Sequence, residues 1–96
     1  MLVLITYDVS TMSSEGQRRL RKVSKICQDY GQRVQHSVFE CIVDATQFTV
    51  LKMKLMDVID PEEDSLRIYQ MGNNYKNKVE HVGIKQSLDL EGPLIV

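Results

Sequence analysis

The sequence predicts an α+β fold in which two helices pack against one small β-sheet. Short apolar segments rich in β-branched residues alternate with two longer segments whose apolar residues repeat every three to four positions. A chain of 96 residues is the size of one domain, so a single domain over residues 1–96 is expected. The composition, 43% hydrophobic and 26% charged, is typical of a folded globule rather than of a disordered chain.

The first strand is predicted over Met1–Val9, where nine mostly apolar residues end in an Asp-Val-Ser-Thr loop. Ser14 and Gln17 fit a capping box, so a helix is expected to begin there. Gly31 ends this helix. Its buried arc is expected to consist of Leu20, Val23, Ile26, Cys27 and Tyr30.

The next segment, Gln32–Val43, is rich in β-formers and has the pattern of one long strand. A four-stranded sheet requires it to fold back as a hairpin near Phe39-Glu40, although none of its residues is typical of a turn. Asp44 and Gln47 then form a second cap signature, and Asp60-Pro61 ends the second helix. The apolar face of that helix is predicted to comprise Phe48, Leu51, Leu55, Val58 and Ile59.

Three extended segments follow the second helix. Ser65–Met71 is predicted as a strand with a Gly72–Asn74 turn after it, and Lys78–Val82 and Pro93–Val96 are weaker extended segments. The order of elements fits a ferredoxin-like βαββαβ sheet with an extra C-terminal strand.

Right-handed crossovers place both helices on the same face of such a sheet, which leaves the other face bare. The first strand is nevertheless apolar on both faces, a pattern typical of a strand covered on both sides. We therefore expect a homodimer in which the sheets of two copies pack together, with the C-terminal strand packing on or pairing with the partner subunit.

Several functional classes are disfavoured by composition. No apolar run is long enough to span a membrane and the first residues lack the basic flank of a signal peptide, so a cytoplasmic protein without a membrane partner is predicted. Cys27 and Cys41 have no metal-ligand spacing and are expected to be reduced, packed thiols. The formal charge of −1 argues against a uniformly basic nucleic-acid-binding protein.

Charge is unevenly distributed, however. The segment Glu15–His36 carries six basic and two acidic residues, a balance of +4, whereas Ser37–Leu66 has a balance of −5. A stripe opposite the apolar arc of the first helix is either a solvated face or a platform for phosphates. This stripe consists of Arg18, Arg21, Lys22 and Lys25. Arg19 differs because it shares the inward stripe, where a guanidinium suits a buried carboxylate or a phosphate.

Asp8 is the charged residue that ends the first strand. It is either a loop-opening aspartate or, if it lies near a two-fold axis, one half of a pair of carboxylates that shares a proton or binds Mg²⁺. Tyr7 and Phe39 either pack in the core or stack on bases, and His36 and His81 are either ordinary side chains or titrating groups. Phosphate-binding loops, dinucleotide motifs and zinc motifs are absent from the sequence.

Four segments together resemble one known family. They are the strand ending Tyr7-Asp8-Val9, the basic helix Arg18–Val23, the segment Arg33–Cys41 (RVQHSVFEC) and the segment Tyr69–Gly72. The chain is similar over essentially its whole length to the second CRISPR-associated protein, the small subunit used in spacer acquisition. The stretch R-V-Q-x-S-V-F-E is the most specific part of this resemblance.

The resemblance implies a ferredoxin-like homodimer in which Asp8 of both subunits binds a divalent metal, magnesium with manganese as a substitute. It also implies an endonuclease acting on double-stranded DNA or RNA in antiviral defence, and a bridge between integrase subunits in which cleavage is dispensable. The implied nucleic-acid-binding positions are Tyr7, Arg19, Arg21, Arg33 and Phe39. Two hypotheses result: a metal-dependent nuclease in which Arg19 and Arg33 hold phosphates, and a non-catalytic scaffold whose basic stripes bind duplex DNA.

Overall fold

Two helices and four strands follow one another in the order β1, α1, β2, β3, α2, β4. We describe residues 1–75 and 77–83 of a computed structural model. The elements are β1 (Leu2–Asp8), α1 (Ser14–Tyr30), β2 (Gly31–Gln35), β3 (Val38–Ile42), α2 (Ala45–Val58) and β4 (Ser65–Gly72). The sheet order is β2-β3-β1-β4 with antiparallel neighbours, which confirms the predicted ferredoxin-like α+β class.

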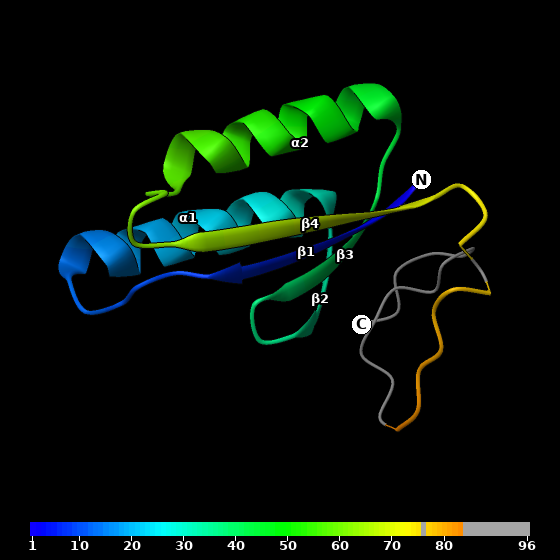
Figure 1. Ribbon diagram of the computed structural model, residues 1–96, viewed down its shortest axis with the longest axis horizontal. Helices are drawn as coiled ribbons and strands as arrows, with labels where there is room; N and C mark the ends of the chain where they lie inside the picture. The colour runs from blue at the N-terminus through cyan, green and yellow to red at the C-terminus, as the bar shows by residue number, and fades with distance from the viewer. Residues whose placement is uncertain (76, 84–96) are drawn as a thin grey trace.

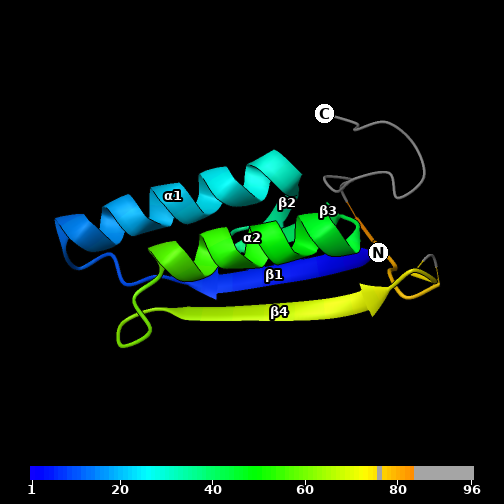
Figure 2. The same cartoon turned by 90° about the horizontal axis from the view of Figure 1, so that it is seen from above.

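Both helices cover one face of the sheet, as the crossover argument predicted (Figure 1; Figure 2). The core between the layers contains Val3 and Ile5 of β1, Phe39 of β3, and Leu51 and Leu55 of α2, all 0% exposed. Val23 and Cys27 supply the contribution of α1. The apolar arcs predicted from the sequence therefore face the sheet, because each helix buries its apolar stripe against the same layer.

The start of α1 differs by one residue from the sequence prediction. Ser13, not Ser14, is the N-cap, and its hydroxyl oxygen accepts a hydrogen bond from the Gly16 amide at 3.1 Å. The cap of α2 is as predicted: the Asp44 carboxylate accepts from the Gln47 amide at 2.7 Å, and the Gln47 side chain accepts from the Asp44 amide. Two adjacent serines before α1 offered competing caps, and local sequence did not distinguish them.

The hairpin between β2 and β3 turns at His36 and Ser37, so the expected turn near Phe39-Glu40 was wrong. Ser37 adopts a positive φ of 63°, a conformation uncommon for residues other than glycine. Phe39 and Glu40 instead lie within β3, paired with Ile5 and Leu4 of β1. Burial of the Phe39 ring between sheet and helices keeps this position in the strand.

The helix-free face of the sheet is partly covered by the chain's own C-terminal segment. Leu2 is 1% exposed, and residues 78–80 line a cavity of about 230 Å³ together with Leu2, Leu4 and Glu40. The predicted extended segment Lys78–Val82 is a turn and an irregular stretch rather than a strand. The predicted strand Pro93–Val96 lies outside the described residues.

Cys27 and Cys41 are free and buried, as expected for packed thiols. Burial raises the pKa of each thiol to about 12, so neither is a reactive thiolate near neutral pH. None of the helices in the described part of the chain is long and apolar enough to cross a membrane.

Candidate active site and basic surfaces

Asp8 stands at the last position of β1, on the face of the sheet that carries no helix. Side chains alternate along a strand, so Asp8 points away from Tyr7, which belongs to the helix-covered core. Its cross-strand partner is Ser65, the first residue of β4. Asp8 is exposed, which leaves its carboxylate accessible to a cation or to a second molecule.

A single chain offers no complete metal site in its described residues. No three His, Cys, Asp or Glu side chains gather there in an arrangement able to hold an ion. Asp8 has the oxygen donors that Mg²⁺ prefers, but Mg²⁺ bound by protein usually takes one or two carboxylates together with water or phosphate oxygens. The chemistry of this donor therefore fits a metal only when a second chain or a nucleic acid completes the site.

The loop after Asp8 is held at Ser10. The Ser10 amide donates to Oδ1 of Asp64 at 3.2 Å, and the Ser10 carbonyl lies against Gly16 of α1. A Cβ built on Gly16 would overlap that carbonyl oxygen, so only glycine fits at this close approach. The β1–α1 loop is thus fixed from two sides, immediately after the candidate active-site residue.

Arg19 binds two carboxylates of the α2–β4 connection. Its Nε donates to Oδ2 of Asp64 at 2.8 Å, and Nη2 lies 3.1 Å from Oε2 of Glu63. The Asp64 side chain is 0% exposed, against 55% for Glu63. The sequence left two partners open for Arg19, a buried carboxylate or a phosphate. In this structure the Arg19 guanidinium binds the buried carboxylate.

Asp64 is charged although it is buried. Burial acts to raise the pKa of Asp64, but hydrogen bonds from Arg19 and from the amides of Asp60 and Ser10 outweigh it and hold the pKa below its usual value. Asp64 was not predicted from the sequence as a functional residue. The inward position of Arg19 was the available signal, since a guanidinium on an apolar stripe requires a partner.

Tyr7 and Phe39 lie in the core, which is the alternative to base stacking that the sequence left open for both rings. Tyr7 is 5% exposed and Phe39 is 0% exposed, and their ring centres are 6.2 Å apart. The Tyr7 hydroxyl forms a 2.9 Å hydrogen bond with the hydroxyl of Ser24 on α1. Neither ring is available to stack on a base in this structure, because both are enclosed between the sheet and the helices.

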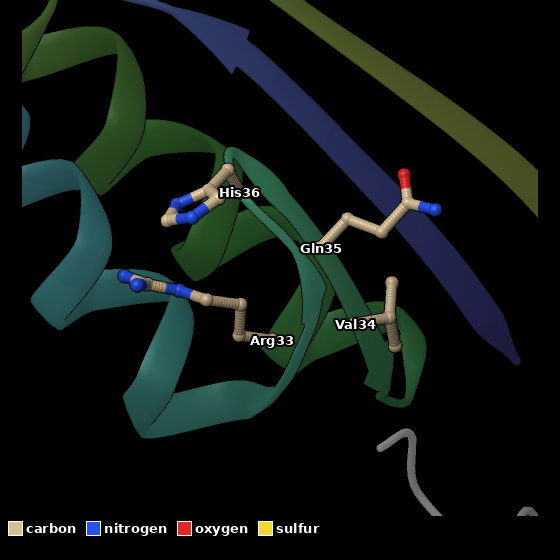
Figure 3. Close-up of a pocket in the computed structure, with 4 residues that line it drawn as sticks. All are labelled: Arg33, Val34, Gln35 and His36. Carbon is tan, nitrogen blue, oxygen red and sulfur yellow. The ribbon is translucent and has the colours of Figure 1, made fainter. Parts of the chain in front are cut away.

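Arg33 packs against one ring of this aromatic pair and reaches the surface. Its guanidinium carbon lies 5.3 Å from the centre of the Phe39 ring, and the residue itself is exposed. It lines a cavity of about 580 Å³ with Val34, Gln35 and His36. Figure 3 shows Arg33 and His36 pointing to one side of the hairpin and Val34 and Gln35 to the other. Arg33 thus places a cation beside the His36 imidazole at the β2–β3 hairpin.

A second basic site lies between the helices, which run side by side in Figure 2. A groove of about 310 Å³ has an apolar floor that includes Ile26 of α1 and Val58 of α2. Its remaining lining residues are the cationic side chains of the predicted stripe, Arg18, Arg21, Lys22 and Lys25. All four are exposed, and of them Lys25 forms an ion pair with Asp29 at 2.7 Å. The stripe is therefore a cationic surface that a ligand can reach.

Glu40 is a further residue whose environment sequence reasoning did not predict. It lies on the helix-free face beside Leu4, its cross-strand partner, and is 6% exposed. Burial raises the pKa of Glu40, while the charge of His81 acts in the opposite direction. The C-terminal segment that brings His81 near β3 supplies this environment, and no local sequence pattern indicates it.

The chain is similar to proteins of one family. Residues 1–79 match the family described as CRISPR associated protein Cas2. The protein named CRISPR-associated endonuclease Cas2 from Halalkalibacterium halodurans is 70% identical over 95 residues, 99% of each chain. The CRISPR-associated endoribonuclease Cas2 from Nitratidesulfovibrio vulgaris is 60% identical over 96 residues, which cover 100% of this chain and 94% of that protein.

Solved structures agree with these relatives. The crystal structure of Streptococcus pyogenes Cas2 at pH 6.5 has a TM-score of 0.74 and 51% identity, and the match covers 86% of this chain and 100% of that chain. A second structure, titled crystal structure of cas2, has a TM-score of 0.67 at 28% identity, with 100% and 98% covered. The match to the second structure spans the whole chain and therefore includes the strands and helices that position Asp8.

Proposed function

The chain belongs to the CRISPR-associated protein Cas2 family, and on this basis we propose that it is an endonuclease of antiviral defence at the spacer-acquisition stage. The reaction is hydrolysis of phosphodiester bonds in double-stranded DNA, single-stranded RNA or both. The observation that carries the proposal is the exposed Asp8 carboxylate at the end of a buried strand, on the face without helices. A carboxylate held at the end of a rigid strand is precise enough to serve a catalytic site.

In this proposal two chains form a homodimer and each contributes one Asp8. The helix-free face is then the contact surface, and the β1 residues Leu4 and Thr6, half-buried in the single chain, become covered. The two carboxylates would hold Mg²⁺, or Mn²⁺ in its place. Such an ion supplies charge neutralisation at the phosphate and activates water. Arg33, exposed at the hairpin cavity and lying over Phe39 on the helix-covered side, would hold a phosphate of the same nucleic acid away from the Asp8 pair.

The test compares wild type with Asp8→Asn on a duplex DNA and a single-stranded RNA oligonucleotide, each with Mg²⁺ and with EDTA. We expect the wild type to cleave with Mg²⁺ but not with EDTA. The cleavage rate with Mg²⁺ should be about a hundredfold or more lower in Asp8→Asn. The exposed α2 residue Asp57 provides a matched control, because Asp57→Asn removes the same charge from a different element. Equal cleavage by wild type and Asp8→Asn would remove Asp8 from the reaction.

A scaffold that bridges integrase subunits on DNA is the second candidate function, favoured by the cationic groove between α1 and α2. Among the residues that the structure describes, no carboxylate lines that groove, which suits phosphates rather than a cleavage site. Changing Arg18, Arg21 and Lys25 together to Ala should weaken duplex binding and reduce its salt slope by about one for each phosphate that is no longer bound. Lys52→Ala, an exposed cation on α2, is the matched control. An unchanged salt slope in the triple variant would eliminate this surface.

The proposed homodimer is tested by the mass of the protein in solution. Light scattering at micromolar protein should give the mass of two chains, both for the wild type and for Asp8→Asn. A mass of one chain would remove the second carboxylate from the proposed site. Binding of the integrase subunit is a separate test. It asks whether that subunit co-elutes with the wild-type chain and with the triple basic variant.

A further inference from the structure

Three elements meet at the buried carboxylate of Asp64, close to the end of β1. It accepts hydrogen bonds from the Ser10 amide at 3.2 Å and from the Asp60 amide at 2.9 Å. Arg19 on α1 adds two more, from Nε at 2.8 Å and from Nη2 at 3.3 Å. One side chain with 0% exposure therefore ties the β1–α1 loop, α1 and the α2–β4 connection together.

These contacts enclose Asp8 in a closed ring. The chain runs from Asp8 to Ser10, whose amide binds the Asp64 side chain, and the residue after Asp64 is Ser65, which pairs with Asp8 across the sheet. A ring of so few residues leaves the backbone at Asp8 and Val9 little freedom. The close packing of the Ser10 carbonyl on Gly16 further restricts movement of the loop.

We propose that Asp64 and Arg19 are positioning residues that aim the Asp8 carboxylate, and that Arg19 does not bind the nucleic acid. The inference deepens the nuclease function proposed above and rests on it. Arg19 already directs Nε and Nη2 to two carboxylates, at 2.8 Å and 3.1 Å, and the negative charges of Asp64 and Glu63 would repel a phosphate placed beside them. A carboxylate that is misplaced by about an ångström loses much of its catalytic effect.

Asp64→Asn and Glu63→Gln form a matched pair of variants. Both remove one negative charge from Arg19, but only Asp64 also holds the Ser10 and Asp60 amides. In Asp64→Asn one side-chain oxygen becomes an NH2 donor and must face another donor. We expect kcat to fall about 10- to 100-fold in Asp64→Asn, with KM unchanged, and to stay within about twofold in Glu63→Gln. Equal kcat in the two variants would overturn the proposal.

Arg19 is tested by separating catalysis from binding. If it positions Asp8, Arg19→Ala lowers kcat and leaves the Kd for duplex DNA and its salt slope as in wild type. If it binds phosphate instead, Kd rises and the salt slope falls by about one, which would overturn the proposal. Because residues of one unit are not additive, the double variant with Asp64→Asn should lose no more activity than Asp64→Asn alone. Arg19→Lys should recover part of the loss, since an ammonium can reach one of the two Asp64 oxygens.

A readout independent of cleavage separates this proposal from the nuclease function. Hydrogen exchange of the Ser10 amide, followed by NMR, should be about tenfold faster in Asp64→Asn than in wild type and Glu63→Gln, with the Asp8 and Val9 resonances shifted. Should Asp64→Asn fail to fold, Arg19→Ala, which removes both bonds from Arg19 to Asp64, serves for the same measurement. Unchanged Ser10 exchange in the folded variant overturns the positioning role. That result is distinct from Asp8→Asn cleaving like wild type, which overturns the nuclease function alone.

Discussion

The two faces of the sheet use neighbouring residues of the same strands for different purposes. On the helix-covered face Val3, Ile5 and Phe39 are 0% exposed and make the core. On the helix-free face the same strands present Asp8 and Glu40, one exposed and one buried under the C-terminal segment. Since adjacent residues in a strand point to opposite sides, one short strand serves both stability and chemistry.

This difference shows where the fold can tolerate charge. The helix-covered face is enclosed within one chain and has no room for an unpaired ion. On the helix-free face, the burial of a charge depends on what covers it, either the chain's own residues 78–80 or a second molecule. Changes to the first face should therefore alter stability, and changes to the second should alter chemistry, association and pH response.

The largest expected effect is loss of stability from Phe39→Ala. Removing the ring leaves a cavity beside Tyr7 and should lower the free energy of unfolding by about 3–5 kcal/mol. Phe39→Leu keeps most of the volume and should cost less. If Phe39 acts only through packing, folded Phe39→Leu binds duplex DNA with the Kd of wild type. Weaker binding by this folded variant would contradict the separation of the two faces. Urea unfolding and fluorescence anisotropy measure the two quantities.

Gly16→Ala should have the next largest effect. Alanine favours helix over glycine by about 1 kcal/mol, but its Cβ has no room beside the Ser10 carbonyl. The forced displacement should outweigh the gain and lower the unfolding free energy by about 1–3 kcal/mol in urea titrations. The exposed α1 residue Gln28 gives the control, since Gln28→Ala should change stability by less than about 0.5 kcal/mol. A stabilised Gly16→Ala would show that the loop after β1 is not fixed.

Glu40→Gln tests the helix-free face through pH. Burial raises the folded-state pKa of Glu40 above its ordinary value of 4.5, so its protonated form is favoured by folding. That contribution is fully present below the unfolded pKa and is lost as pH rises through the folded pKa. Glutamine cannot ionise, so the variant should gain stability relative to wild type as the pH is raised above 4.5. A stability difference independent of pH, in urea titrations, would contradict the burial of this carboxylate.

The smallest expected effect comes from the surface of α1. Lys25→Ala removes one exposed ion pair with Asp29, four residues later, and should cost only about 0.3–0.5 kcal/mol. The cost should diminish in high salt, because salt screens exposed charges. Thermal unfolding at low and high ionic strength measures it. A loss of several kcal/mol would mean that the basic stripe supports the fold rather than remaining free for a ligand.

Local sequence patterns predicted most of the fold. Apolar periodicity located both helices and the face each presents, and the Asp44 cap and the Gly31 stop were confirmed. The hairpin turn was missed because Ser37 adopts a positive φ without the usual glycine. The cap of α1 was assigned to Ser14 rather than Ser13, since adjacent serines have the same local capacity to cap.

The candidate residues named from the sequence lie in two different settings. Asp8, Arg33 and the α1 stripe are exposed where a ligand can reach them, whereas Tyr7 and Phe39 are enclosed in the core. Arg19 was singled out correctly as unusual, but its partner was not identified. Asp64 is 45 residues away from it in the sequence, and no local pattern connects two residues at that separation.

The sequence by itself determined the class of the fold, the faces of the helices and the position of one carboxylate at a strand end, because each depends on residues within a few positions of one another. The tertiary structure alone decided that Asp64 holds the loop after Asp8 and that Glu40 is buried. It also decided that the aromatic residues are enclosed. These features arise from contacts between segments far apart in the chain, where burial and hydrogen bonding, rather than local preference, fix the charge and the direction of a side chain.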